Sequence, residues 1–97
     1  MRFWAIVNYS ICTEDNRTIL AVRIRDENPI EKAYISVHHN FLEIEGYKFR
    51  QGEKLLINCS IETVLIDNIS GIELIADYIA HEMGVEVLNR SACHFPF

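Results

Sequence analysis

The sequence has 97 residues and a net charge of −5, with 49% hydrophobic and 24% charged side chains. This length accommodates one domain, and the composition is that of a folded chain rather than a disordered one. No apolar run approaches the roughly 20 residues that cross a bilayer, and the apolar start becomes polar too early for a signal peptide. Cys12, Cys59 and Cys93 are odd in number and form no C-x-x-C pair, which favours free thiols. We therefore expect one cytoplasmic domain over residues 1–97, without membrane association.

The negative charge is concentrated in the second part of the chain. Residues 1–40 carry five basic and five acidic side chains, whereas residues 41–97 carry four basic and nine acidic ones. No lysine or arginine occurs between Leu55 and Asn89. Because clustered lysine and arginine bind a phosphate backbone, this distribution argues against direct binding of nucleic acid and favours a basic protein partner.

The first part of the chain predicts three strands. Residues 3–11 are rich in β-branched and aromatic types and indicate a first strand. A polar turn over 12–16 leads into a second strand over 17–25, so the two should form an antiparallel hairpin. Residues 33–38 alternate and indicate a third strand, with a short helical turn over 30–33 as the competing interpretation.

The middle of the chain predicts two further strands. Residues 41–49 indicate a fourth strand, bent at Gly46, where the missing side chain lowers strand preference. A turn over 50–53 then leads into a fifth strand over 54–60. The pattern does not decide whether residues 61–67 continue this strand or form a bent extension.

A helix over about residues 70–83 is the strongest local prediction. Ser70 and Glu73 have the spacing of a capping box, and Gly84 stands where a left-handed C-terminal cap belongs. Between them the apolar residues recur at helical spacing: Ile72, Ile75, Ala76, Ile79, Ala80 and Met83. Residues 85–88 indicate a short last strand, which a helical crossover would place parallel to a neighbour. The predicted fold class is α+β, a mostly antiparallel five- to six-stranded sheet with one main helix packed on one face.

No residue pattern matches a catalytic or metal-binding motif. His38 and His39 are adjacent on a predicted strand, so they point to opposite faces and cannot easily share a metal ion. His81, Cys93 and His94 lack ligand spacing, so structural histidines are the better interpretation. The four glycines are isolated and offer no phosphate-binding loop. The sequence predicts neither an enzyme nor a bound cofactor or metal.

The outer face of the predicted helix carries the candidate partner-binding residues. They occupy two rows at i,i+4 spacing, one acidic and one apolar. These residues are Glu73, Leu74, Asp77, Tyr78 and His81. An exposed aromatic residue among carboxylates is typical of an interface anchor, and the carboxylates would steer a basic partner. In the alternative, the C-terminal tail covers Leu74 and Tyr78, and the pattern favours neither interpretation.

In its size, its acidic stretch from Leu55 to Asn89 and its single capped helix over 70–83, the chain resembles small bacterial immunity proteins, including those of contact-dependent growth inhibition systems. The resemblance implies a protein that neutralises a toxin, such as a nuclease, by covering its active or substrate-binding surface. It transfers no functional residue. Two other hypotheses are a phage-type inhibitor or adaptor of a host enzyme, and a small enzyme or ligand-binding domain. Exposed strand edges also leave a homodimer open.

Overall fold

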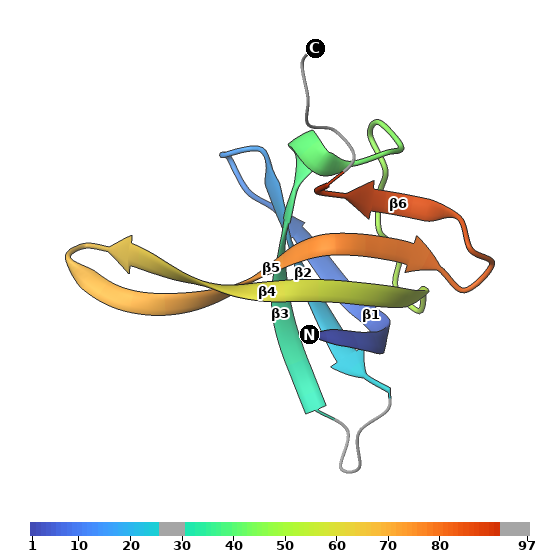
Figure 1. Cartoon of the computed structure of the whole chain (residues 1–97), viewed down its shortest axis with the longest axis horizontal. Coiled ribbons are helices and arrows are strands. Elements are labelled where there is room, and N and C mark those ends of the chain that lie inside the picture. The colour runs from blue at the N-terminus through green and yellow to red at the C-terminus, as the bar shows by residue number, and fades with distance from the viewer. Residues whose placement is uncertain (26–30, 92–97) are drawn as a thin grey trace.

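The fold is built from strands. The structure, a computed structural model, describes residues 1–25 and 31–91. Six strands follow one another in chain order: β1 (Arg2–Cys12), β2 (Arg17–Ile24), β3 (Glu31–His38), β4 (Lys54–Ile66), β5 (Ile69–His81) and β6 (Glu86–Asn89). One 3-10 turn, η1 (His39–Phe41), follows β3, and the described residues contain no α-helix (Figure 1). The fold is therefore all-β, and the predicted α+β class is wrong.

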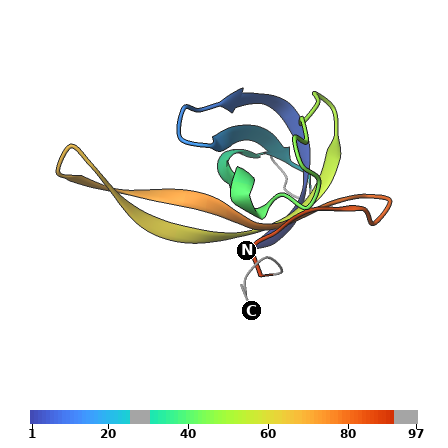
Figure 2. The ribbon, with the colours of Figure 1, turned by 90° about the horizontal axis from the view of Figure 1, so that it is seen from above.

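The six strands form one sheet that closes on itself. Its order is β3–β2–β1–β4–β5–β6, and the neighbours in this order are antiparallel. The sheet closes where Ile35 and Ser36 of β3 pair in parallel with Leu74 and Ile75 of β5. Five strands thus make a ring in the order β1–β2–β3–β5–β4, and β6 extends β5 outside it. Figure 2 shows the ring from above.

Residues 69–81 form β5 in place of the predicted helix, because they pair with β4 along their whole length. The register between the two strands shifts at Asp77, which is an extra residue in β5. Such a bulge changes the spacing of core-facing residues from two to three. Buried Ala76 and Ile79 therefore lie three positions apart, as they would on a helix. The bulge accounts for the helical spacing of Ala76 and Ile79, whereas Ile72 and Met83, which the predicted helix would have placed on its apolar stripe, are exposed.

The two residues predicted to cap the helix lie in a strand and in a turn of the sheet. Ser70, the expected cap, pairs with Leu65 of β4. Gly84 lies in the β5–β6 turn with a φ of 87°, where its N–H donates to the His81 carbonyl at 2.8 Å. This left-handed conformation explains the glycine equally well in a turn and in a helix cap. Because a turn connects β5 to β6, the last strand is antiparallel to its neighbour, and the predicted parallel crossover is wrong.

The other predicted strands are largely confirmed. The first two form the expected antiparallel hairpin, and residues 31–33 belong to β3 rather than to a helical turn. Residues 61–66 continue β4, which decides the question that the pattern left open. Residues 41–49 form no strand, and an isolated bridge joins Leu42 to Leu88.

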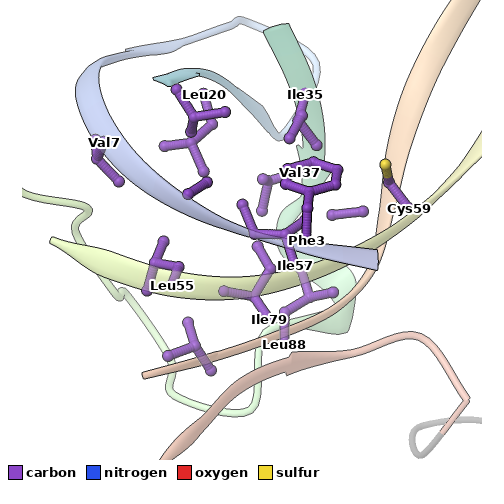
Figure 3. Packing of buried hydrophobic residues seen from close by; sticks show 14 residues of the cluster. Phe3, Val7, Leu20, Ile35, Val37, Leu55, Ile57, Cys59, Ile79 and Leu88 are labelled. Carbon is purple, nitrogen blue, oxygen red and sulfur yellow. The ribbon is translucent and has the colours of Figure 1, made fainter. Parts of the chain in front are cut away.

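The hydrophobic core fills the ring. Every strand contributes to it, and the side chains labelled in Figure 3 point toward one another: Phe3, Val7, Leu20, Ile35, Val37, Leu55, Ile57, Cys59, Ile79 and Leu88. Complete burial of one such aliphatic side chain contributes about 1.5–3 kcal/mol. The loop over 42–53 packs against this core through Tyr47 and Phe49, and its Glu53 carbonyl accepts the Val7 N–H at 2.9 Å.

Beyond the ring, β4 and β5 continue as a projecting two-stranded hairpin, coloured yellow to orange in Figures 1 and 2. We call residues 61–73 the distal hairpin. Its two-residue turn consists of Asp67 and Asn68, with φ values of 49° and 65°. Positive φ at both central residues is the conformation of the type I′ turn, which suits the twist of a hairpin.

Candidate functional site

Two of the five residues predicted to bind a partner form ion pairs with arginines of the same chain. Arg17 Nη1 lies 2.7 Å from Glu73 Oε1, and Arg90 Nη1 lies 3.2 Å from Asp77 Oδ1. Arg90 also binds Glu62 at 3.0 Å. These ion pairs neutralise carboxylates that the sequence suggested would attract a basic partner.

The other three predicted residues lie in three different surroundings along β5. Leu74 packs against the core, so it is not an exposed anchor. Tyr78 is half-buried and lines a shallow pocket beside Asn58. His81 Nε2 lies 2.9 Å from Glu53 Oε2. The predicted site therefore has no common helical face, and the role of these residues in binding a partner stays a prediction.

A different surface gathers exposed aromatic and basic side chains. It is the outer face of β1, β2 and β3, and its central row consists of Tyr9, Ala21 and Tyr34, which are register partners across the three strands. Tyr9 is 49% exposed and Tyr34 is 60% exposed, while Ala21 between them is 4% exposed. The hydrogen bond with the Tyr34 side chain raises the pKa of the Tyr9 hydroxyl. The two side chains, which start about 10 Å apart on strands flanking β2, therefore bring their hydroxyl groups together across Ala21.

A basic row lies directly beside the tyrosine row. Ile6, Arg23 and Lys32 are register partners across the same three strands, and Arg23 and Lys32 are exposed. Arg25 is exposed at the end of β2, where its N–H donates to the Trp4 carbonyl at 2.9 Å. Within the described part of the chain, no carboxylate forms an ion pair with Arg23, Arg25 or Lys32.

An apolar row borders the tyrosines on their other side. Ile11, which is 55% exposed, pairs with Ile19 of β2. Together, the apolar, tyrosine and basic rows form what we call the tyrosine face. It consists of Ile6, Tyr9, Ile11, Ile19, Ala21, Arg23, Arg25, Lys32 and Tyr34.

A groove runs along one border of the tyrosine face, between β3 and the base of the distal hairpin. Its volume is about 380 Å³. Its lining residues are Ile19, Lys32, Ala33, Tyr34, Ser36, Ile72, Glu73 and Leu74. The tyrosine face therefore continues from the exposed tyrosine pair into a concave, mainly apolar border.

Two other polar clusters hold loops in place. His39 Nε2 lies 2.7 Å from Thr18 Oγ1, and His39 Nδ1 lies 3.1 Å from Asn16 Oδ1, so this histidine connects η1 to the β1–β2 turn. Tyr47 is hydrogen-bonded to both Glu53 and His81, which fixes the 42–53 loop to β5. Burial, followed by the hydrogen bond to Glu53, raises the pKa of the Tyr47 hydroxyl.

Neither histidine cluster resembles a metal site. Across residues 1–25 and 31–91, no group of three or more His, Cys, Asp or Glu side chains is arranged to hold a metal ion. Cys93 and His94, which the sequence offers as further ligands, lie outside the described residues, as does the tail that could cover Tyr78.

Comparisons with known proteins identify no relative. No protein-family model matches the chain, and neither the curated proteins nor the solved structures yielded a match. Within the described residues, no helix is long and apolar enough to cross a membrane.

The exposure of Tyr9 and Ile11 on the tyrosine face follows from a bulge in β1. In β1 the register shifts between Val7 and Tyr9, so a bulge at Asn8 moves Tyr9 and Ile11 from the core side to the outer side. Strict alternation would have buried both residues. The polar turn at 12–16 nevertheless fixes the hairpin register, and this register places Tyr9 opposite Ala21.

Proposed function

We propose that this protein binds single-stranded nucleic acid on the tyrosine face. The observation that carries the proposal is the exposed tyrosine pair, Tyr9 and Tyr34, beside the exposed cations Arg23 and Lys32. Bases stack on aromatic side chains with little regard to sequence, which contributes about 1–3 kcal/mol per base. Lysine and arginine next to such a platform balance the phosphates. A duplex keeps its bases stacked inside, so a single strand fits this face better.

The strand order supports the same function. A five-stranded ring in the order β1–β2–β3–β5–β4, closed by a parallel β3–β5 pair, has the connectivity of the oligonucleotide/oligosaccharide-binding fold. Proteins with that fold bind their ligands on the face of strands 2 and 3, flanked by the β1–β2 and β4–β5 loops. The tyrosine face lies between the turn at residues 13–16 and the distal hairpin, which are the corresponding loops. Connectivity alone does not define function, so it adds to the side-chain argument.

The local charge also supports the proposal, although the sequence argued against nucleic acid. That argument rested on the acidic excess of residues 41–97. Glu62, Glu73 and Asp77 of this segment are paired with Arg17 and Arg90. The basic residues of the tyrosine face come from residues 1–40, where the opposite charges balance in number. A phosphate near β2 and β3 therefore meets cations rather than the average charge of the chain.

The inhibitor of a basic toxin that the sequence suggests stays a prediction. The helix on which its binding site was placed is absent from the described residues, and its acidic residues Glu73 and Asp77 form internal ion pairs. The tyrosine face has no counterpart in that hypothesis, so the two functions predict different effects of substitutions at Tyr34 and Tyr78.

Fluorescence anisotropy with labelled oligonucleotides of about 15 nucleotides, near the upper end of the usual site size, tests the proposal. Comparing the affinities for oligothymidylate and oligouridylate distinguishes a preference for DNA from a preference for RNA. A duplex of equal length serves as the competitor. Tyr34→Ala should weaken binding about 10- to 100-fold because it removes one stacking ring. Tyr34→Phe keeps the ring and should stay within about threefold of the wild type.

Tyr78→Ala is the matched control, because Tyr78 lies on β5 outside the tyrosine face. Its affinity for the oligonucleotide should equal that of the wild type. Equal losses for Tyr34→Ala and Tyr78→Ala, or equal binding of single strand and duplex, would refute the proposed face. Wild-type protein that binds none of the oligonucleotides at low salt would refute the function.

A further inference from the structure

The distal hairpin exposes more apolar surface than a free two-stranded element normally does. Ile61, Leu65, Ile69 and Ile72 are 59%, 69%, 71% and 77% exposed. Apolar patches of this kind mark interaction sites, and an isolated two-stranded hairpin is only marginally stable in water. This hairpin therefore lacks the third strand that would stabilise it.

One long edge of the distal hairpin is available for pairing. β1 pairs with β4 only up to Asn58, and Met1 forms two backbone hydrogen bonds with Cys59. From Ser60 onward, no described strand pairs with this side of β4. The edge over 60–66 has no proline, lysine or bulge, which are the features that usually prevent edge-to-edge pairing.

The backbone polarity of this edge can be derived from Cys59. Its N–H and C=O bond to Met1 at 2.7 and 2.9 Å, so they point away from β5. Along a strand these groups alternate in direction. Ile61, Thr63 and Leu65 consequently present their N–H and C=O groups at the open edge.

We infer that two copies of this chain pair antiparallel through the open edge of β4, around a twofold axis at Thr63. In this register Thr63 meets Thr63 of the second copy, and Ile61 meets Leu65. About six backbone hydrogen bonds form between the outward-pointing groups. The apolar pairs lie on one face of the resulting four-stranded sheet, next to Ile72, which is the register partner of Thr63 within each hairpin.

The charges along the edge favour this register over its neighbours. They also allow a second copy of the chain to be the partner. Glu62 is the one charged residue among 60–66, and the Thr63 axis places it opposite Val64 of the second copy. An axis at Glu62 would set two glutamates side by side, and an axis at Val64 would set Ile61 opposite Asp67. Arg90, 3.0 Å from Glu62, neutralises its charge, so two such edges approach without repulsion.

Sedimentation velocity over about 5–500 μM tests the dimer, because an interface of this small size implies a dissociation constant in the micromolar range. The apparent mass should rise from that of the monomer toward twice that value. Thr63→Pro should keep the protein monomeric throughout. Its missing N–H points away from β5, so the substitution removes no hydrogen bond of the hairpin.

Ile69→Lys is the control, since Ile69 lies on the other strand of the hairpin, across from residue 66. This variant should dimerise like the wild type. A wild type that remains monomeric at the highest concentration overturns the inference, and so does a dimer that survives Thr63→Pro. Loss of the dimer in Ile69→Lys alone would move the interface to β5.

Cross-linking checks the axis independently of affinity. In a Cys12→Ser, Cys93→Ser background, Thr63→Cys should form a disulfide dimer, because directly paired Cα atoms lie about 5.5 Å apart. Leu65→Cys should not, because the two copies of residue 65 would lie about 14 Å apart along the strands. Cross-linking of Leu65→Cys without that of Thr63→Cys would place the axis elsewhere. Oligonucleotide binding by Thr63→Pro shows whether the tyrosine face acts independently of the dimer.

Discussion

Two arginines determine where charge remains on the surface of this protein. Arg17 binds Asp15 at 2.8 Å and Glu73 at 2.7 Å, and Arg90 binds Glu62 and Asp77. Arg17 therefore connects two carboxylates that are far apart in the sequence, and Arg90 connects a carboxylate of β4 to one of β5. Among the described residues, Arg23, Arg25 and Lys32 form no such ion pair.

Asp15 provides a pH-dependent test of this arrangement. The hydrogen bond from Arg17 lowers the pKa of Asp15 to about 2, compared with about 3.9 in an unfolded chain. Since the folded-state pKa is the lower one, the contribution of the carboxylate to stability is present above about pH 4 and is lost as the pH falls toward 2. Asp15→Asn should therefore lower the unfolding temperature at pH 7, by a margin that shrinks between pH 4 and 2. Thermal unfolding at a series of pH values measures this margin, and a margin independent of pH would contradict the assignment.

Among the elements, β5 shows both what the sequence can predict and why part of it was misleading. The strands with regular alternation, such as β2 and β3, could be predicted because one face of each is buried. The bulges at Asp77 and Asn8 each shift the alternation by one residue. In β5 the shift imitated a helix, and in β1 it concealed the exposure of Tyr9. A bulge depends on the partner strand, so the sequence of a single strand does not reveal it.

The site was harder to predict than the strands. Its tyrosines come from β1 and β3, which never pair directly, and only β2 brings them together. The five predicted partner-binding residues would share one face only on a helix, and residues 69–81 form a strand instead. His38 and His39 do not share a strand: His38 ends β3, while His39 begins η1 and lies against Thr18 and Asn16.

Arg17 also connects elements, because it reaches from β2 across β3 to β5. Its Nη1 lies 3.3 Å from Ser36 Oγ and 2.7 Å from Glu73, at the point where the ring closes. Arg17→Met should cost about 1–2 kcal/mol of unfolding free energy, since both partners of the ion pair are about three-quarters buried. Urea denaturation measures this loss. Lys32→Met, an exposed cation on the neighbouring strand, should stay within about 0.5 kcal/mol of the wild type; an equal loss for both variants would show that Arg17 does not stabilise the closure.

At the scale of the whole molecule, the charges are separated although the net charge is −5. Three exposed cations, Arg23, Arg25 and Lys32, lie together on the tyrosine face, while residues 55–89 contain no lysine or arginine. A single-stranded nucleic acid bound to the tyrosine face would therefore have few of its phosphates in contact with cations, because the protein as a whole is acidic. Such a protein should bind single strands moderately and with a shallow dependence on salt.

The salt dependence gives a quantitative test of this view. Three phosphate contacts, by Arg23, Arg25 and Lys32, predict a slope of about −2 in a plot of log K against log salt concentration for a single strand. Lys32→Met should reduce the magnitude of this slope by about 0.7, whereas Tyr34→Ala should weaken binding and leave the slope unchanged. Anisotropy titrations at several salt concentrations measure both. A slope that Lys32→Met leaves unaltered would exclude that lysine from the contact.

The parallel closure of the ring also sets the order in which the chain can acquire its structure. Ile35 and Ser36 can pair with β5 only after Leu74 and Ile75 have been synthesised. Met1 can form its hydrogen bonds only after Cys59, which lies 58 residues away, has been synthesised. In the folded protein, β4, β5 and β6 contribute much of the core that covers the apolar inner side of β1–β3. Contacts of such long sequence separation slow folding to milliseconds or seconds. A chain that stops before β5 lacks the core residues of β5 and β6 and the strand that closes the ring, so we expect truncated products to aggregate more readily than the whole chain.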